Sequence, residues 1–214
     1  KNFPLYSDCY FTGNDSLIDS FINKVTEINE ENREYNKNNP NDQIAYPSSD
    51  WENPSTFEEI KNYYFRLADA AERPMLVYHF PAFSGVNMGV NEMGQFLNDD
   101  RFIGIKYTSN DFFTMEQCKT NFPSKIVYNG FDEMFLAGLS MGADGGIGST
   151  YNFMADKFVK MKSLFEACKI VEAQELQKEA NKIIAVLCKI GVTQAEKEVL
   201  NQLGFDFGIC RHPF

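Results

Sequence analysis

The sequence predicts an α/β fold in which parallel strands alternate with helices, followed by a region made of helices. Three observations support this prediction. From about residue 55 to about residue 150, short apolar runs typical of buried strands alternate with helical segments. Their spacing fits successive βα units, in which right-handed crossovers join parallel strands. After residue 150 the apolar residues recur with the helical period.

The first part of the chain has a different composition. Apolar residues at 17, 18, 21, 22, 25 and 28 predict a helix over 16–28. Residues 28–43 hold almost nothing to bury, so we expect a solvated linker that ends near Asp42. This change divides the chain into a divergent N-terminal part at 1–43, a βα region at 44–152 and a helical region at 153–214.

The βα region is expected to begin with a capped helix. Ser55 is the N-cap, Glu58 lies three residues later as a capping box requires, and the helix should run to about Ala71. The elements expected after it are a strand at 74–80, a short helix near 90–98, a strand at 102–108, a helix near 112–120, a strand at 125–129, a helix at 132–141 and a short strand-like segment at 145–149. The helical region should hold helices at 153–167, 170–190 and 193–203, with Gly191 and Gly204 as stop signals.

Composition argues against several classes of protein. Thirty acidic residues against twenty basic ones give a net charge of -10, which would repel nucleic acids and anionic membranes at long range. The sequence has no apolar run of about eighteen residues and no apolar signal core at its start, so we expect neither a membrane span nor secretion. The cysteines are odd in number and far apart, which disfavours a zinc site or a disulfide framework and favours free thiols in a reducing cytoplasm: Cys9, Cys118, Cys168, Cys188 and Cys210.

The strand at 102–108 carries an unusual lysine. Side chains alternate between the two faces of a strand, so Ile103 and Ile105 should face the covering helices. Lys106 then lies on the opposite face with Thr108, a face that is normally apolar in a parallel sheet. Burial should lower the pKa of this lysine, and a neutral lysine is the nucleophile that forms a Schiff base with a carbonyl substrate. The alternative is a lysine at the strand end that reaches solvent.

The strand at 74–80 places Tyr78 on the same face as Phe80. A phenol one strand away from Lys106 could move protons at an imine carbon, although most tyrosines at such positions are core residues with a satisfied hydroxyl. His79 falls on the opposite face, which makes it a poor catalytic candidate.

Two polar segments follow the strand at 125–129. Asp132 and Glu133 begin a helix, where they either bind a ligand or complement the helix dipole. The glycine-rich segment 144–150 includes Ser149 and offers backbone N–H groups and a hydroxyl to a carboxylate or a sugar. It lacks the lysine of a P-loop and the spacing of a Rossmann motif, so alone it is a weak signal.

Four segments together resemble the N-acetylneuraminate lyase family in residue type, order and spacing. They are Val77–Gly85, Gly104–Thr108, Tyr128–Glu133 and Gly142–Asn152, and the likeness extends from about Thr56 to Phe214. With dihydrodipicolinate synthase, this family belongs to the class I aldolases that form a pyruvate Schiff base on a (β/α)8 TIM barrel. The resemblance therefore implies a TIM barrel of this type, incomplete on its N-terminal side, with C-terminal helices. It also implies a cytoplasmic homotetramer without a metal or organic cofactor.

The resemblance further implies roles for individual residues. Lys106 would form the Schiff base with the C2 carbonyl of sialic acid or pyruvate, and Tyr78 would work with the substrate carboxylate as a proton relay. Thr108 would contact the substrate near the scissile bond. The residues implied to bind the hydroxyls of the sugar tail are Gly130, Asp132, Glu133, Gly148 and Ser149. The expected reaction is reversible cleavage of N-acetylneuraminate to pyruvate and N-acetylmannosamine, so these small molecules are the expected partners.

Two features favour the sialic acid branch of this superfamily. Phe83 stands where the synthases usually have an arginine for an amino-acid carboxylate, and the acidic pair suits a polyol. The family's early Gly-Gly-Ser-Thr-Gly-Glu loop, which holds the pyruvate carboxylate, has no counterpart in this sequence, and 36–50 stands where the second and third units are expected. Three interpretations stay open: a working lyase, a related Schiff-base lyase or synthase with another aldehyde, and a catalytically impaired remnant with a binding role.

Overall fold

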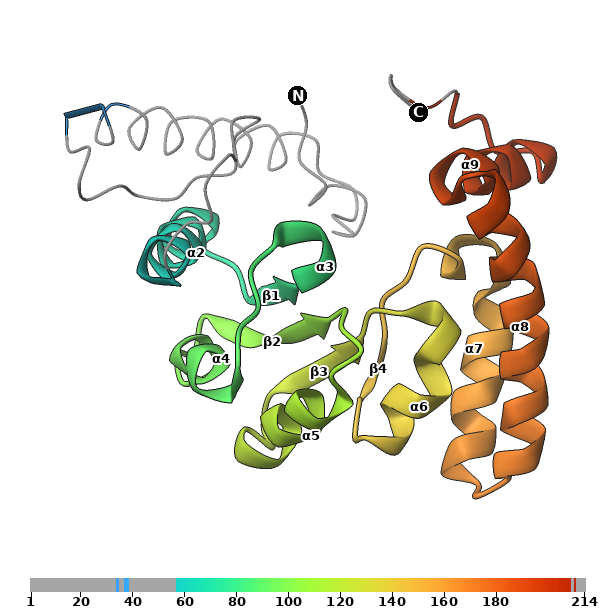
Figure 1. Ribbon diagram of the computed structural model, residues 1–214, viewed down its shortest axis with the longest axis horizontal. Helices are drawn as coiled ribbons and strands as arrows, with labels where there is room; N and C mark the ends of the chain where they lie inside the picture. Colours follow the sequence, from blue (N-terminus) through green and yellow to red (C-terminus); the bar gives the residue numbers. More distant parts are fainter. Residues whose placement is uncertain (1–33, 35–36, 39–56, 209, 211–214) are drawn as a thin grey trace. The chain divides into compact units, whose positions relative to one another are not determined.

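The structure, a computed structural model, describes residues 34, 37–38, 57–208 and 210. Its elements follow one another as in Figure 1: α2 (Phe57–Ala71), β1 (Met75–His79), α3 (Pro81–Ser84), α4 (Val90–Leu97), β2 (Phe102–Tyr107), α5 (Phe112–Asn121), β3 (Ile126–Asn129), η2 (Asp132–Met134), α6 (Phe135–Ser140), β4 (Gly145–Gly146), α7 (Tyr151–Glu166), α8 (Ile170–Ile190) and α9 (Val192–Gln202). The prediction of alternating strands and helices, followed by helices alone, is confirmed over these residues.

The four strands form one sheet in the order β1-β2-β3-β4 (Figure 1). β3 and β4 pair in parallel, with Tyr128 opposite Gly145 and Asn129 opposite Gly146. Neighbouring parallel strands need a crossover connection, and a helix stands between each pair of consecutive strands. These are the successive βα units from which a TIM barrel is built.

The chain divides into two compact units. The first comprises the described residues up to Ile105 together with Gln117–Ile126, and the second comprises Lys106–Glu116 together with the described residues from Val127 onward. Lys106 and the predicted sugar-binding residues lie in the second unit, whereas Tyr78 lies in the first.

The core of the first unit is aromatic. Phe96 of α4 and Phe102 of β2 are fully buried, and their rings meet edge to face with centroids 5.5 Å apart. Tyr64 and Phe65 of α2 pack against both rings, with centroid distances between 5.3 and 6.5 Å. Aromatic pairs in such geometries add about 0.5–1.5 kcal/mol to the free energy of area burial. Ring packing therefore holds α2 and α4 against β2.

The charged groups of this unit gather around Arg101. Its Nη2 lies 2.8 Å from Asp99 Oδ2, its Nη1 pairs with Asp69, and its guanidinium lies 4.7 Å from the centroid of the Phe65 ring. The hydrogen bonds from Arg101 lower the pKa of Asp99 to about 2. Arg101 and Asp99 are both half-buried, so this ion pair lies at the margin of the aromatic core.

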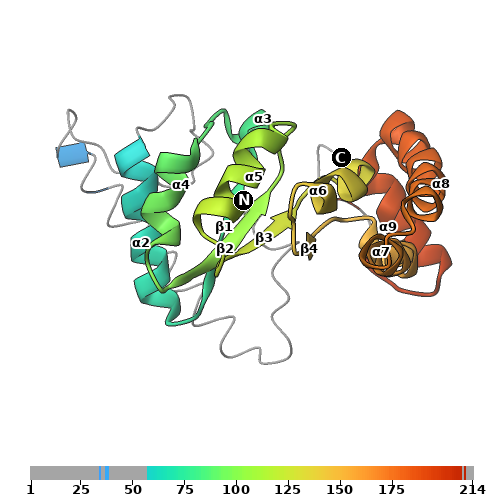
Figure 2. The same cartoon turned by 90° about the horizontal axis from the view of Figure 1, so that it is seen from below.

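The second unit is built on long helices. α7 and α8 lie side by side in both views (Figures 1 and 2) and pack with α6. The ring of Phe158 lies 5.6 Å from that of Phe135 and 4.2 Å from that of Tyr151, centroid to centroid. Gln177 of α8 donates from Nε2 to the backbone oxygen of Asp132 at 3.0 Å and accepts from Leu136 N at 3.0 Å. The long helices therefore hold the segment that follows β3.

Two local predictions need correction. The helix expected at 132–141 is split into the 3-10 turn η2 and α6, because Met134, the last residue of η2, has non-helical backbone angles. The strand-like segment expected at 145–149 is a strand at Gly145–Gly146, after which the chain turns around the Asp132 carboxylate. The sequence also did not predict the short helix α3, where Pro81 supplies a helical φ at the start and Gly85, at φ 73°, ends the turn.

Two further predictions differ, one of exposure and one of secondary structure. Ile103 was expected beneath the helices but is 37% exposed, so the described elements leave this position of β2 uncovered. The predicted linker contains three described residues, Glu34, Lys37 and Asn38, which are exposed as expected but helical. Glu and Lys form helices readily even where nothing is buried. The helix expected at 16–28 and the Ser55 cap lie outside the described residues. The division at residues 43 and 152 stays a prediction.

Two findings test the predictions about membrane spans and disulfide bonds. In the part of the chain that the structure describes, no helix combines the length and apolar character that crossing a membrane requires. Cys118, Cys168, Cys188 and Cys210 are thiols rather than disulfide partners, as predicted, and Cys9 lies outside the described residues.

Candidate active site

Lys106 and Thr108 lie at the carboxyl end of β2. Lys106 is 7% exposed, and Thr108, which follows the strand, is 3% exposed. The burial predicted for Lys106 is confirmed, and the alternative of a lysine that reaches solvent is wrong. Parallel α/β folds place their active sites at the carboxyl ends of their strands.

The backbone after β3 passes close to Thr108. Gly130 N donates to the backbone oxygen of Tyr107 at 2.8 Å. A Cβ atom at Gly130 would lie 1.8 Å from Thr108 Oγ1, so this approach requires glycine. The Thr108 hydroxyl is buried and has no hydrogen-bond partner among the residues that the structure describes. Such an atom costs free energy unless a ligand or a water satisfies it, which makes Thr108 a candidate binding residue.

Asp132 is a buried carboxylate of the same unit, 6% exposed. Its Oδ2 accepts hydrogen bonds from Thr150 N, at 3.0 Å, and from Thr150 Oγ1. Burial raises the pKa of Asp132; the Thr150 hydrogen bonds and the charge of Lys106 oppose the rise, and the charge of Glu133 adds to it. Lys106 and Asp132 belong to the same unit, and the charge of Lys106 is one of the smaller influences on the Asp132 carboxyl.

Gly148 lies directly against the second oxygen of Asp132. A Cβ atom at Gly148 would be 1.4 Å from Asp132 Oδ1. The glycine-rich loop can therefore lie this close to the carboxylate only with glycine at position 148. Oδ1 is buried and has no hydrogen-bond partner among the described residues. Asp132 thus holds the loop through one oxygen and leaves the other for a donor that the described residues do not supply.

The remaining two predicted sugar-binding residues, Glu133 and Ser149, are exposed. The backbone oxygen of Glu133 accepts from Asn181 Nδ2 at 3.0 Å, which fixes the main chain and leaves the carboxylate outside. Ser149 Oγ donates to Glu196 Oε1 at 2.7 Å. The acidic pair therefore divides into a buried carboxylate that organises the loop and an exposed one that is accessible to a ligand.

Sequence reasoning missed three residues at this site: Thr150, Tyr151 and Glu196. Burial raises the pKa of the Tyr151 phenol, and the charges of Asp132 and Glu133 raise it further. A Cβ atom at Gly146 would lie 2.5 Å from the Tyr151 hydroxyl, which explains a further glycine of the loop. Thr150 and Tyr151 lie within or next to the glycine-rich motif, so the motif could have identified them. Glu196 lies far along the chain and has no motif around it.

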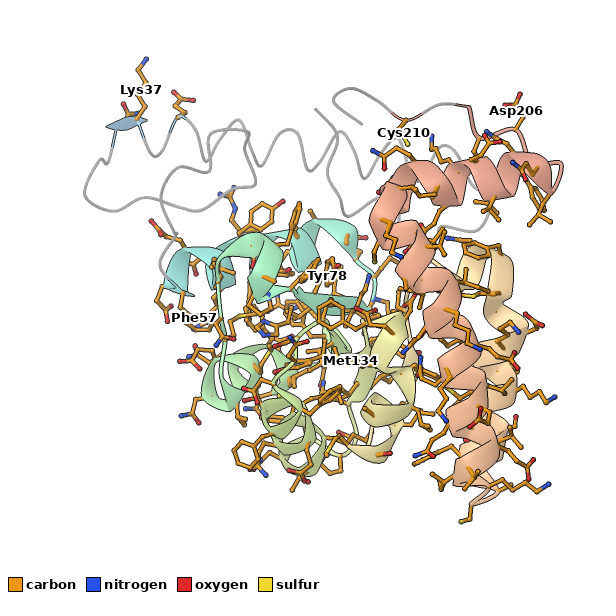
Figure 3. The ribbon with its side chains drawn as sticks, turned by 45° about the vertical axis from the view of Figure 1, so that its right-hand side comes forward. Lys37, Phe57, Tyr78, Met134, Asp206 and Cys210 are labelled. Atoms are coloured by element: carbon orange, nitrogen blue, oxygen red, sulfur yellow. The ribbon has the colours of Figure 1, made fainter. Side chains whose placement is uncertain are left out.

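Tyr78 is half-buried on β1, and its ring lies 5.9 Å from that of Phe80 (Figure 3). Val77 and His79, which alternate with it, are fully buried, as expected for the opposite face of the strand. Because Tyr78 belongs to the first unit and Lys106 to the second, their approach to one another stays a prediction.

The described residues include no group of three or more His, Cys, Asp or Glu side chains arranged to hold a metal ion. The predicted binding side chains that share a unit with Lys106 carry hydroxyls and carboxylates: Thr108, Asp132, Glu133 and Ser149. Such groups bind the hydroxyls of a polar organic ligand.

Comparison with known proteins identifies the relatives of this chain. Residues 51–214 match the Dihydrodipicolinate synthetase family. The N-acetylneuraminate lyase of Rhizobium meliloti (strain 1021) is 44% identical over 156 residues, which are 73% of this chain and 52% of that protein.

Solved structures give the same relationship. CdNal from Clostridium difficile, in complex with mannosamine, has a TM-score of 0.73 and 34% identity, covering 76% of this chain and 56% of that one. The N-acetylneuraminate lyase of Fusobacterium nucleatum complexed with pyruvate has a TM-score of 0.71 and 34% identity, covering 80% and 57%. The chain therefore spans about half the length of the relatives that it matches.

Proposed function

Because the chain belongs to the dihydrodipicolinate synthetase family, we propose that its site is that of an N-acetylneuraminate lyase, which cleaves N-acetylneuraminate to pyruvate and N-acetylmannosamine. The observation that carries the proposal is the burial of Lys106 beside Thr108, in one unit with the Asp132 carboxylate. The lyase of Rhizobium meliloti, the mannosamine complex and the pyruvate complex support the choice of substrate and products.

Lys106 would act as the nucleophile. Its neutral amine attacks the C2 carbonyl of the substrate, water leaves, and a protonated imine forms. The C3–C4 bond then breaks, its electrons pass to the imine as an enamine, and the C4 hydroxyl loses its proton as the aldehyde forms. Protonation of the enamine at C3 and hydrolysis release pyruvate and restore the lysine. Because the imine is the electron sink, the proposed mechanism uses no metal or organic cofactor.

Tyr78 would carry the proton between the C4 hydroxyl and its acceptor, working with the substrate carboxylate as a relay. Thr108 would contact the substrate near the bond that breaks. The burial of its unpartnered hydroxyl supports this role, since a ligand would satisfy it.

The sugar tail would lie along the second-unit residues Gly130, Asp132, Glu133, Gly148 and Ser149. Gly130 and Gly148 supply close backbone approach rather than side-chain contacts, and the free oxygen of Asp132 would accept a tail hydroxyl. We further propose that the whole protein is a cytoplasmic homotetramer.

The test is release of pyruvate from N-acetylneuraminate by the 214-residue chain. Lys106→Met should lower kcat by roughly three orders of magnitude or more, because the nucleophile is lost. Lys162→Met is the matched control, since Lys162 lies on α7 of the same unit and pairs with Glu166 at the surface. A Lys106→Met variant with wild-type activity would refute the assignment. Addition of pyruvate to a panel of aldehydes distinguishes this lyase from a related enzyme with another substrate.

A further inference from the structure

A buried carboxylate lies behind the predicted sugar-binding hydroxyl of Ser149. Ser149 Oγ donates to Glu196 Oε1 at 2.7 Å, and Glu196 is 8% exposed. Glu196 belongs to α9 and Ser149 to the loop before α7, so the hydrogen bond joins two distant segments of the second unit.

Both ends of this hydrogen bond are fixed by their surroundings. Ala195 and Glu196 are the buried residues of α9, a helix that follows its cap residue Gly191 and packs against α7 and α8. On the other side, Asn152 Nδ2 donates to the backbone oxygen of Ser149 at 2.8 Å. The orientation of the Ser149 hydroxyl is therefore set by the fold before any ligand arrives.

A carboxylate at position 196 is costly for folding. A buried carboxylate loses hydration that its hydrogen bonds recover in part, and an apolar side chain would fill the same inner face of α9 without that cost. Departures of this kind from the apolar pattern are expected at functional sites.

The proton count decides what Ser149 can recognise. An ionised carboxylate accepts hydrogen bonds and donates none, and a serine hydroxyl has one proton. Ser149 is an exposed residue that donates its proton to Glu196, so its oxygen offers lone pairs to a ligand. It therefore accepts a hydrogen bond from a ligand O–H and cannot at the same time donate to a ligand carboxylate, which the nearby charge of Glu196 also repels.

We propose that Glu196 is a positioning residue that fixes Ser149 as a hydrogen-bond acceptor and makes this part of the site select neutral sugar hydroxyls over carboxylates. The inference rests on the proposed function for the identity of the ligand. Asp132 and Glu133 of the same unit add negative charge that acts in the same direction. Ser149 belongs to the glycine-rich motif, but the proposed selectivity of Ser149 depends on Glu196 of α9.

The test measures affinity for two ligands that differ at one carbon, N-acetylmannosamine and its C6 carboxylate. Both are titrated into the full chain and its variants, with binding followed by calorimetry. Glu196→Gln keeps the shape but removes the charge and supplies an amide donor to Ser149, whose hydroxyl can then turn outward. Glu198→Gln is the matched control, because Glu198 is an exposed residue of the same helix that accepts from Gln202 Nε2 at 2.8 Å.

The wild type should prefer the neutral sugar by about tenfold or more, and Glu196→Gln should reduce this ratio by about tenfold. Glu198→Gln should leave it unchanged. Ser149→Ala should lower affinity for the neutral sugar, and adding Glu196→Gln should lower it no further, since the two residues act through one hydrogen bond. A ratio that Glu196→Gln does not change, or absence of binding to both ligands, overturns the proposal.

A separate readout keeps this proposal distinct from the proposed function. Borohydride trapping of pyruvate on Lys106 reports imine formation and does not involve the sugar tail. If trapping fails while Glu196→Gln shifts the ratio as expected, the lyase mechanism is wrong and the selectivity proposal is supported. If trapping succeeds while the ratio is unaffected, the reverse holds.

Discussion

The two units of this chain differ in their buried polar groups, which include His79 in the first unit and Lys106, Thr108 and Asp132 in the second. In the first, buried rings pack around Phe96 and Phe102, and the Arg101–Asp99 pair lies at the margin of that core. In the second, Lys106, Thr108 and Asp132 are buried, and two of them carry atoms without a partner among the described residues. Unsatisfied buried polar atoms destabilise a fold, so they indicate groups reserved for a ligand. The first unit is therefore held mainly by aromatic packing and contributes Tyr78 to the proposed mechanism, whereas the second unit holds the other residues of the proposed site.

The greatest loss of stability is expected when the aromatic core of the first unit is disrupted. Phe96→Ala removes a fully buried ring from the aromatic cluster and should lower the free energy of unfolding by about 3–5 kcal/mol. Denaturant titration measures the loss. Lys106→Met should show the opposite pattern, with activity lost and stability close to wild type. Equal losses of stability in both variants would contradict the division between packing and chemistry.

A smaller effect is expected in the glycine-rich loop. Gly148→Ala places a Cβ atom 1.4 Å from Asp132 Oδ1 and should cost about 1–3 kcal/mol as the loop is displaced. Gly145→Ala is the control, because its Cβ atom would meet Tyr128 at an ordinary contact of 3.4 Å. Thermal unfolding of both variants checks the difference, and a Gly148→Ala protein as stable as Gly145→Ala would show that the loop does not depend on this approach.

Within the second unit, the adjacent residues Asp132 and Glu133 should respond differently to substitution. Glu133 is exposed, so Glu133→Ala should change stability little but weaken use of N-acetylneuraminate by about tenfold or more. Imine formation with pyruvate, which lacks the tail, should be unaffected. If both activities fall equally, Glu133 serves the helix terminus rather than the substrate.

The smallest effect concerns pH and the first unit. Hydrogen bonds from Arg101 lower the pKa of Asp99 to about 2, below the value near 3.9 of an unfolded aspartate. A lowered folded-state pKa contributes stability that is present above about pH 4 and is lost as pH falls toward 2. Because the pair is half-buried, the contribution is at most about 1 kcal/mol. Between about pH 5 and about pH 2.5, the free energy of unfolding should therefore fall more steeply for the wild type than for Asp99→Asn, as measured by denaturant titration. Identical profiles would show that the pair does not contribute to stability.

Much of this fold could be predicted from the sequence because its signals are local. Apolar runs gave β1, β2 and β3 within a few residues, and the alternation of side chains along β2 placed Lys106 on the inner face. The same alternation was wrong for Ile103, since exposure depends on which elements cover a strand rather than on the strand alone.

The site was less predictable because its contacts join distant segments. The motif identified Gly130 and Gly148, but their close approaches to Thr108 and Asp132 exist only once the strands are side by side. No pattern separates buried Asp132 from exposed Glu133, which are adjacent in the chain. The hydrogen bond from Ser149 to Glu196 depends on how α9 packs, and no sequence pattern near either residue predicts it.

The most direct test of the central claim is the position of a pyruvate adduct. After incubation with pyruvate and borohydride, trypsin should not cut at a modified Lys106, so the adduct should appear on the peptide from Phe102 to Lys119. We expect this adduct in the wild type and in Phe83→Ala, and its loss in Lys106→Met. A reduced pyruvate adduct on a different lysine, in a preparation that cleaves N-acetylneuraminate, would contradict the claim that the buried lysine of β2 is the nucleophile.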